Sequence, residues 1–115
     1  MTEYLKQKKL LYEHLISFLE DESCSSEDFQ TFIKIIDDQK ITQNDKEFEI
    51  LLRLISKISK NHHRSLNFNQ KIKKIIEHYS NEIKQTFTNV EIVNFFKSNK
   101  LILIYLFDNK VIKFV

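Results

Sequence analysis

The sequence of 115 residues contains neither glycine nor proline. At an average usage of ~7% glycine and ~5% proline, about eight and six of them would be expected. These two residues supply most tight turns, left-handed helix ends and sharp helix stops. A sheet of several strands needs many such turns, whereas helices joined by short polar loops need few. The composition therefore predicts an all-α protein, and it excludes chemistry that depends on a glycine-rich loop.

Part of this gap reflects base composition, because alanine is absent as well. Glycine, proline and alanine all need GC-rich codons, while the abundant Ile, Lys, Phe, Asn and Tyr use AT-rich ones. The helical prediction therefore needs a second basis. That basis is the spacing of the apolar residues, together with polar residues suited to begin helices.

The overall composition suits one domain that can bury a core, since 42% of the residues are hydrophobic and 30% are charged. A net charge of +2 lacks the basic excess of a dedicated nucleic-acid binder. The single cysteine, Cys24, excludes an internal disulfide. We find no signal peptide, and the longest apolar run, 101–107, is far shorter than the ~20 residues that cross a bilayer. We therefore expect a cytoplasmic protein without a membrane span.

Apolar residues recur at helical spacing along the chain, as in Phe29, Phe32, Ile33 and Ile36. The stripes predict about six helices, over residues 3–20, 27–37, 45–60, 68–87, 89–97 and 101–107. We expect a single helical domain over 1–115, stacked as antiparallel pairs with short connections. In it, 1–60 carries three helices, 61–67 is a polar loop and 68–115 carries the other three.

Polar residues mark the expected helix starts: Ser25 or Ser26, Asn44, Asn67 and Thr88. Asn44 and Thr88 are each followed three residues later by glutamate, which is the spacing of a capping box. The segment Ser25-x-x-Asp28 also matches a site for an acidophilic kinase. A phosphate there would favour a helix N-terminus, so a helix start and a phosphorylated Ser25 are compatible.

The last fifteen residues allow two structures. Seven contiguous apolar residues over 101–107 fit either a buried strand or a helix that is packed on most sides. Residues 108–110 could turn such a strand into 111–115 as a β-hairpin. We favour a helix, because the chain before it is helical and an isolated hairpin is weak.

Several runs resemble a known domain. They are Leu51–Arg64, Asn67-Phe68 with the lysines that follow, Thr88–Phe107 and the opening run Tyr4–Tyr12. Together they resemble the N-terminal helical domain that precedes ankyrin repeats in a large set of proteins from a parasitic flagellate. The resemblance covers essentially the whole chain, and its motifs are loose and consist mainly of apolar spacing. It implies an all-α, ankyrin-associated module without known catalysis.

The chain departs from ordinary ankyrin repeats, which use a Thr-Pro-Leu-His turn and glycines between helices. Neither feature is present here. At most, 88–115 forms a degenerate ankyrin-like helix pair, and repeats would lie beyond Val115.

We find no constellation of residues that indicates catalysis, a metal or another cofactor. The adjacent pair His62-His63 is the most suggestive, but two ligands on one helix face need a spacing of four residues. We expect these histidines to be solvated or to cap a loop. A Ser, His and Asp triad can be drawn from this sequence, but nothing indicates the strained turn or oxyanion hole that it needs.

The sequence favours a non-catalytic protein–protein interaction or capping module, whose partner is another protein or the following ankyrin repeats. Solenoid units bury their cores only against neighbours, so we expect the last two helices to offer apolar surface. The candidate residues of this surface are Leu103, Tyr105, Leu106, Ile112 and Phe114. The alternative is binding to nucleic acid or another anionic surface through lysine-rich helix faces, with affinity that falls steeply with salt. The candidate residues for it are Arg64, Lys71, Lys73 and Lys74.

Overall fold

A computed structural model describes residues 2–23 and 26–113, and over these ranges the backbone forms helices and turns but no strand. Within them, seven α-helices and one 3-10 helix, η1, follow one another along the chain. They are α1 (Thr2–Glu20), α2 (Ser26–Asp38), η1 (Ile41–Gln43), α3 (Asp45–His62), α4 (Leu66–His78), α5 (Ser80–Thr86), α6 (Asn89–Phe96) and α7 (Lys100–Asp108). The predicted all-α class is confirmed.

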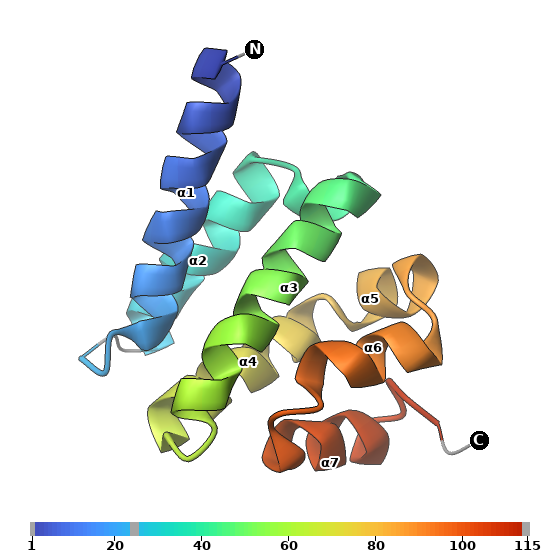
Figure 1. Ribbon diagram of the computed structural model, residues 1–115. Coiled ribbons are helices and arrows are strands. Elements are labelled where there is room, and N and C mark those ends of the chain that lie inside the picture. The colour runs from blue at the N-terminus through green and yellow to red at the C-terminus, as the bar shows by residue number, and fades with distance from the viewer. Residues whose placement is uncertain (1, 24–25, 114–115) are drawn as a thin grey trace.

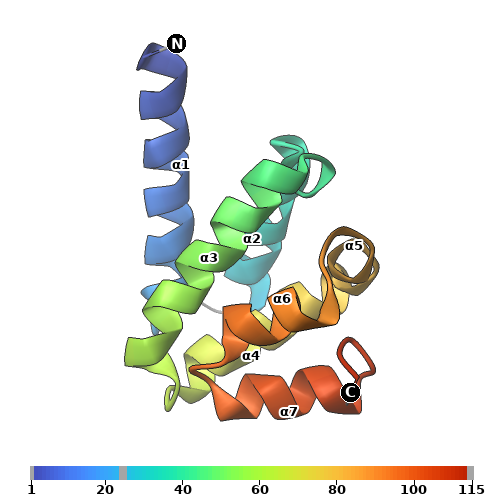
Figure 2. The same cartoon turned by 45° about the vertical axis from the view of Figure 1, so that its right-hand side comes forward.

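Three pairs of helices reverse direction along the chain (Figure 1). Helix α2 returns beside α1, α4 returns behind α3, and α7 returns beside α6. Helix α3 crosses the middle of the molecule and packs against α1, η1 and α6. The amino-terminal turns of α1 project beyond the other helices, while α6 and α7 lie toward the opposite end (Figure 2).

The core is built from large side chains, in keeping with the lack of alanine. Five phenylalanines are fully buried: Phe29, Phe32, Phe48, Phe68 and Phe96. The ring centroids of Phe29 and Phe32 lie 5.3 Å apart, a separation typical of favourable aromatic pairs. Helix α3 contributes a full stripe to this core, because its buried apolar residues recur at helical spacing.

The predicted helix over 68–87 is wrong in one respect, because the structure divides it into α4 and α5 at Tyr79. The backbone there leaves helical geometry, with φ −110° and ψ 21°. The buried hydroxyl of Tyr79 donates to Asp37 Oδ1 at 2.8 Å and lies 3.3 Å from the carbonyl oxygen of Ile33. These long-range contacts hold Tyr79 against α2. The local sequence contains no glycine or proline from which the break in the helix could have been predicted.

The predicted polar loop over 61–67 is shorter in the structure, where α3 continues to His62 and α4 begins at Leu66. The N-cap of α4 is Ser65, whose side chain accepts a hydrogen bond from the backbone N–H of Phe68. Asn67, the predicted cap, instead directs its amide toward the carbonyl oxygen of Glu22 at 3.4 Å. The predicted starts at Asn44 and Thr88 are confirmed, and the Thr88 capping box is complete in both directions.

The apolar run over 101–107 is helical, as favoured, and forms most of α7. The chain then turns, so that Val111 and Ile112 are buried in the core instead of forming a strand. Ser25 and Phe114, both singled out in the sequence, lie outside the described residues.

Two helices end with a lysine in the left-handed conformation that usually belongs to glycine. Lys40, after α2, has φ 54°, and Lys110, after α7, has φ 59°. At the second position the N–H of Lys110 bonds to the carbonyl of Phe107, and the N–H of Val111 bonds to that of Leu106. This is the hydrogen-bond pattern of a Schellman motif, formed here without glycine.

We expect Lys40→Gly to stabilise the protein, because glycine has no Cβ to clash with the following carbonyl at positive φ. The relief of ~1–2 kcal/mol is partly offset by the greater freedom of glycine in the unfolded chain, which leaves about 0.5–1 kcal/mol. Urea unfolding followed by circular dichroism measures the change. Lys40→Ala removes the same side chain but keeps Cβ, so it should give no such gain. Equal stability of the two variants would contradict the strain at this position.

Candidate interaction surfaces

Helix α7 presents three large apolar side chains to solvent. The exposed fractions of Leu101, Ile104 and Phe107 are 55%, 57% and 39%. Their spacing of three residues places them along one side of the helix. The other side is in the core, where Ile102 and Leu106 are fully buried. Contiguous exposed apolar surface is typical of an interaction site, and we call these three residues the α7 face.

The predicted docking residues differ from the α7 face. Leu106 and Ile112 are buried core residues, so they are not available to a partner. Leu103 and Tyr105 are half-buried and pack against the core. Because all seven residues of the run are apolar, its composition does not reveal which side of the helix faces inward. The helix was placed correctly, but its rotation about its own axis was not.

A buried polar cluster at the start of α7 fixes that rotation. The side chain of Asn99 is fully buried and accepts a hydrogen bond from the backbone N–H of Ile102 at 3.3 Å. Its amide donates to Asn69 Oδ1 at 2.7 Å and to Ser59 Oγ at 3.2 Å. These bonds join α7 to α3 and α4, so Asn99 both caps α7 and orients it.

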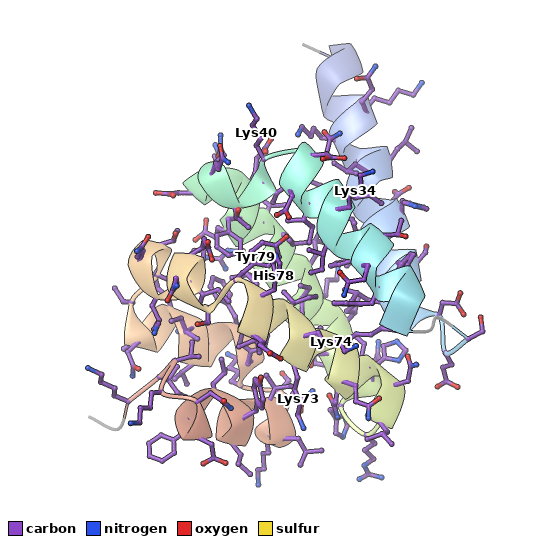
Figure 3. The ribbon with its side chains drawn as sticks, turned by 180° about the vertical axis from the view of Figure 1, so that it is seen from behind. Lys34, Lys40, Lys73, Lys74, His78 and Tyr79 are labelled. Carbon is purple, nitrogen blue, oxygen red and sulfur yellow. The ribbon has the colours of Figure 1, made fainter. Side chains whose placement is uncertain are left out.

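The four predicted basic residues do not form one patch. Arg64 is exposed near the start of α4. The ammonium of Lys73 lies 5.6 Å from the ring centroid of Tyr105 on α7, and that of Lys74 lies 6.0 Å from the ring of Phe29 on α2 (Figure 3). Lys73 and Lys74 therefore lean toward different neighbouring helices and do not converge on a common ligand.

Lys71 has a structural position that the sequence did not reveal, since its side chain is only 4% exposed. Its ammonium donates to the carbonyl oxygens of Phe18 at 3.0 Å, Leu19 at 3.3 Å and Asp21. Helix α1 has no basic residue of its own in its last turn. Lys71 therefore supplies both the donors and the positive charge that the end of α1 requires, and its place in a solvent-exposed basic patch was a wrong prediction.

His62 contacts another helix, whereas His63 makes a local contact. His62 Nε2 lies 2.7 Å from Glu20 Oε2, and its ring stacks on Phe68 with centroids 5.3 Å apart. His63 Nδ1 lies 2.9 Å from the carbonyl oxygen of Lys60. Among the described residues, no group of three or more His, Cys, Asp or Glu side chains is placed to hold a metal ion. Over the same residues, no helix has the length and apolarity to cross a membrane.

Tyr79, His78 and Asp37 form a small cluster between α2 and the end of α4 (Figure 3). Burial, followed by the hydrogen bond to Asp37, raises the pKa of the Tyr79 phenol far above its ordinary value. The phenol therefore stays protonated and serves as a hydrogen-bond donor. His78 Nε2 is 3.9 Å from Asp37 Oδ2, and both side chains are about half exposed. This cluster holds α2 and the end of α4 together.

A groove of about 460 Å³ between α3 and α6 is lined by four basic side chains that the sequence analysis did not single out. They are Arg53, Lys57 and Lys60 on α3 and Lys97 after α6. The signal for the first three was present, because residues i, i+4 and i+7 share one side of a helix. It was missed because these residues are spread along α3, whereas Lys71, Lys73 and Lys74 lie close together in the sequence.

The comparisons with known proteins identify no relative: no family model, no curated protein and no solved structure matches this chain. The resemblance to an ankyrin-associated domain therefore stays a prediction. The proposals that follow concern two surfaces, the α7 face and the groove between α3 and α6, which we call the α3–α6 groove.

We expect Lys71→Met to destabilise the protein by about 1–3 kcal/mol, because methionine keeps the apolar stem but cannot donate to the carbonyls of α1. Urea unfolding measures the change. Lys73→Met is the matched control, because Lys73 is a neighbouring lysine on α4 whose ammonium lies over the ring of Tyr105 and not at the end of α1. Its effect should stay within about 0.5 kcal/mol. A Lys71→Met variant as stable as the wild type would show that the ammonium does not secure α1.

Proposed function

We propose that this chain is a non-catalytic interaction module and that the α7 face is the surface on which a further helical unit packs. The observation that carries the proposal is the exposure of Leu101 and Ile104, which are each more than half accessible on a helix whose other side is fully buried. Covering a large exposed apolar side chain with a neighbouring unit lowers the free energy of the protein.

The size of the α7 face favours a neighbour in the same polypeptide over a free partner. Full burial of a Leu, Ile or Phe side chain is worth ~1.5–3 kcal/mol, and about half of each is already buried, so docking would gain roughly 2–5 kcal/mol. Association of two separate molecules costs about 4–15 kcal/mol in lost freedom of motion. A covalent connection removes most of that cost, because it raises the effective concentration of the neighbour.

The helical pair α6–α7 suits a cap for helical repeats. Its two helices run antiparallel at the end of the molecule away from the projecting turns of α1 (Figure 2). Units of a helical repeat array stack on their neighbours through such pairs. The sequence resemblance favours ankyrin repeats as the unit that follows, and we propose a cytoplasmic location with it.

The first test is the binding of a hydrophobic fluorescent dye to residues 1–115. We expect dye fluorescence with the wild type and a loss of most of it in Leu101→Asp/Ile104→Asp, because charged side chains remove the apolar surface. Leu10→Asp changes another exposed leucine, on α1, and should keep the signal. Sedimentation should show a monomer for all three. Equal dye binding by the wild type and the double variant would contradict the proposal.

A second test concerns the neighbour itself. The coding sequence downstream of Val115 should continue into helical repeats, and these should slow amide exchange in α7 when they are present in the expressed protein. A stop codon directly after Val115 would rule out a neighbour linked at that end, and unchanged exchange in α7 would rule out docking of the repeats on the α7 face.

A further inference from the structure

The groove between α3 and α6 is formed by two matching helix faces. Arg53, Ser56, Lys57 and Lys60 line it from α3, and Glu91, Asn94, Phe95 and Ser98 line it from α6 and the turn that follows. Each set has the spacing i, i+3, i+4, i+7, which is one continuous side of a helix. The groove therefore follows from the packing of α3 on α6.

The charge of this groove is strongly positive for a protein of net charge +2. Four of its lining residues are basic and one, Glu91, is acidic. Arg53 lines the groove, but its guanidinium is paired at 3.2 Å with Glu49, which is not a lining residue. For Lys57, Lys60 and Lys97, no ion pair is found among the described residues, and all three are exposed. Three lysine charges are thus available to a ligand.

The acidic residue in the groove is already engaged. Glu91 Oε1 accepts a hydrogen bond from the backbone N–H of Thr88 at 2.9 Å, as part of the capping box. This bond and a second one with the Thr88 side chain lower the pKa of Glu91, so it is ionised and oriented toward its own helix start. Its charge reduces the positive potential of the groove but does not neutralise it.

The remaining lining indicates a ligand recognised by charge and hydrogen bonds. Ser56, Asn94 and Ser98 offer short polar side chains beside the lysines. The one aromatic residue in the lining, Phe95, is buried, and the guanidinium of Arg53 lies 5.9 Å from its ring centroid. It therefore gives no exposed platform on which a nucleic-acid base could stack. The volume of about 460 Å³ is within the range of small-molecule sites.

We propose that the α3–α6 groove binds a ligand that carries two or more neighbouring phosphate groups. Several lysines on one helix side match several phosphates better than a single carboxylate, and phosphate oxygens also accept from the hydroxyl and amide groups beside them. This binding site is independent of the α7 face, so either proposal can fail without the other.

Titration calorimetry with inorganic tripolyphosphate at ~50 mM salt, where exposed charges are little screened, tests the site. We expect saturable binding of one tripolyphosphate per chain by the wild type. Lys57→Gln/Lys60→Gln should weaken it about tenfold, the effect of losing two exposed ion pairs. Both positions are exposed and glutamine is a good helix former, so the variant should fold, which circular dichroism checks.

Lys73→Gln/Lys74→Gln is the matched control, because it removes the same charge from α4, outside the groove. It should change the affinity by less than about twofold, because these two half-buried lysines lie outside the groove and make no direct contact with its ligand. An equal loss in both double variants would show attraction to the net charge and overturn the proposal. The absence of saturable binding by the wild type would overturn it as well.

A parallel measurement identifies the source of the phosphates. Phosphatidylcholine vesicles that contain phosphatidylinositol bisphosphate present neighbouring phosphates on a lipid headgroup. Tighter binding to these vesicles than to tripolyphosphate, lost in Lys57→Gln/Lys60→Gln, would support a lipid headgroup in the groove. Binding to tripolyphosphate but not to the vesicles would support a soluble phosphorylated ligand.

Discussion

The arrangement of this protein depends on how its helix ends are satisfied without glycine or proline. Each helix leaves four N–H groups at its start and four carbonyls at its end without partners in the helix. At the starts of α3, α4, α6 and α7, side chains of Asn, Ser and Thr accept from the free N–H groups. At the ends of α1, α2 and α7 the chain uses lysine where glycine is the usual solution, either in a left-handed backbone or as a donor from another helix.

Two of these end contacts are also tertiary contacts, which is why they determine more than local structure. Lys71 joins the end of α1 to α4, and Asn99 joins the start of α7 to α3 and α4. Asn99 sets the rotation of α7 and thereby decides that Ile102 and Leu106 face inward while Leu101 and Ile104 face solvent. The apolar surface that we propose for docking is thus a consequence of a buried cap one turn away.

The sequence allowed the helices to be predicted well and the surfaces poorly, for a physical reason. Apolar spacing reports which side of a helix is buried wherever polar residues alternate with it, as in α2 and α3. In 101–107 every residue is apolar, so the spacing carries no information about rotation, and Leu106 was placed on the surface although it lies in the core. The break at Tyr79 was equally hidden, because it depends on contacts with Ile33 and Asp37, more than forty residues earlier.

Lysine shows most clearly why composition does not translate directly into surface charge. Lys71 is buried as a helix cap, Lys40 and Lys110 occupy left-handed turns, and Lys57 and Lys60 line a groove. The contiguous cluster 71–74 looked like the basic site because charge is easily read along the chain. The groove instead collects lysines that are separated in sequence but share one side of α3, with Lys97 added from beyond α6. One side of α3 thus supplies three of the four basic groups, and the packing of α6 on α3 forms the groove and adds Lys97.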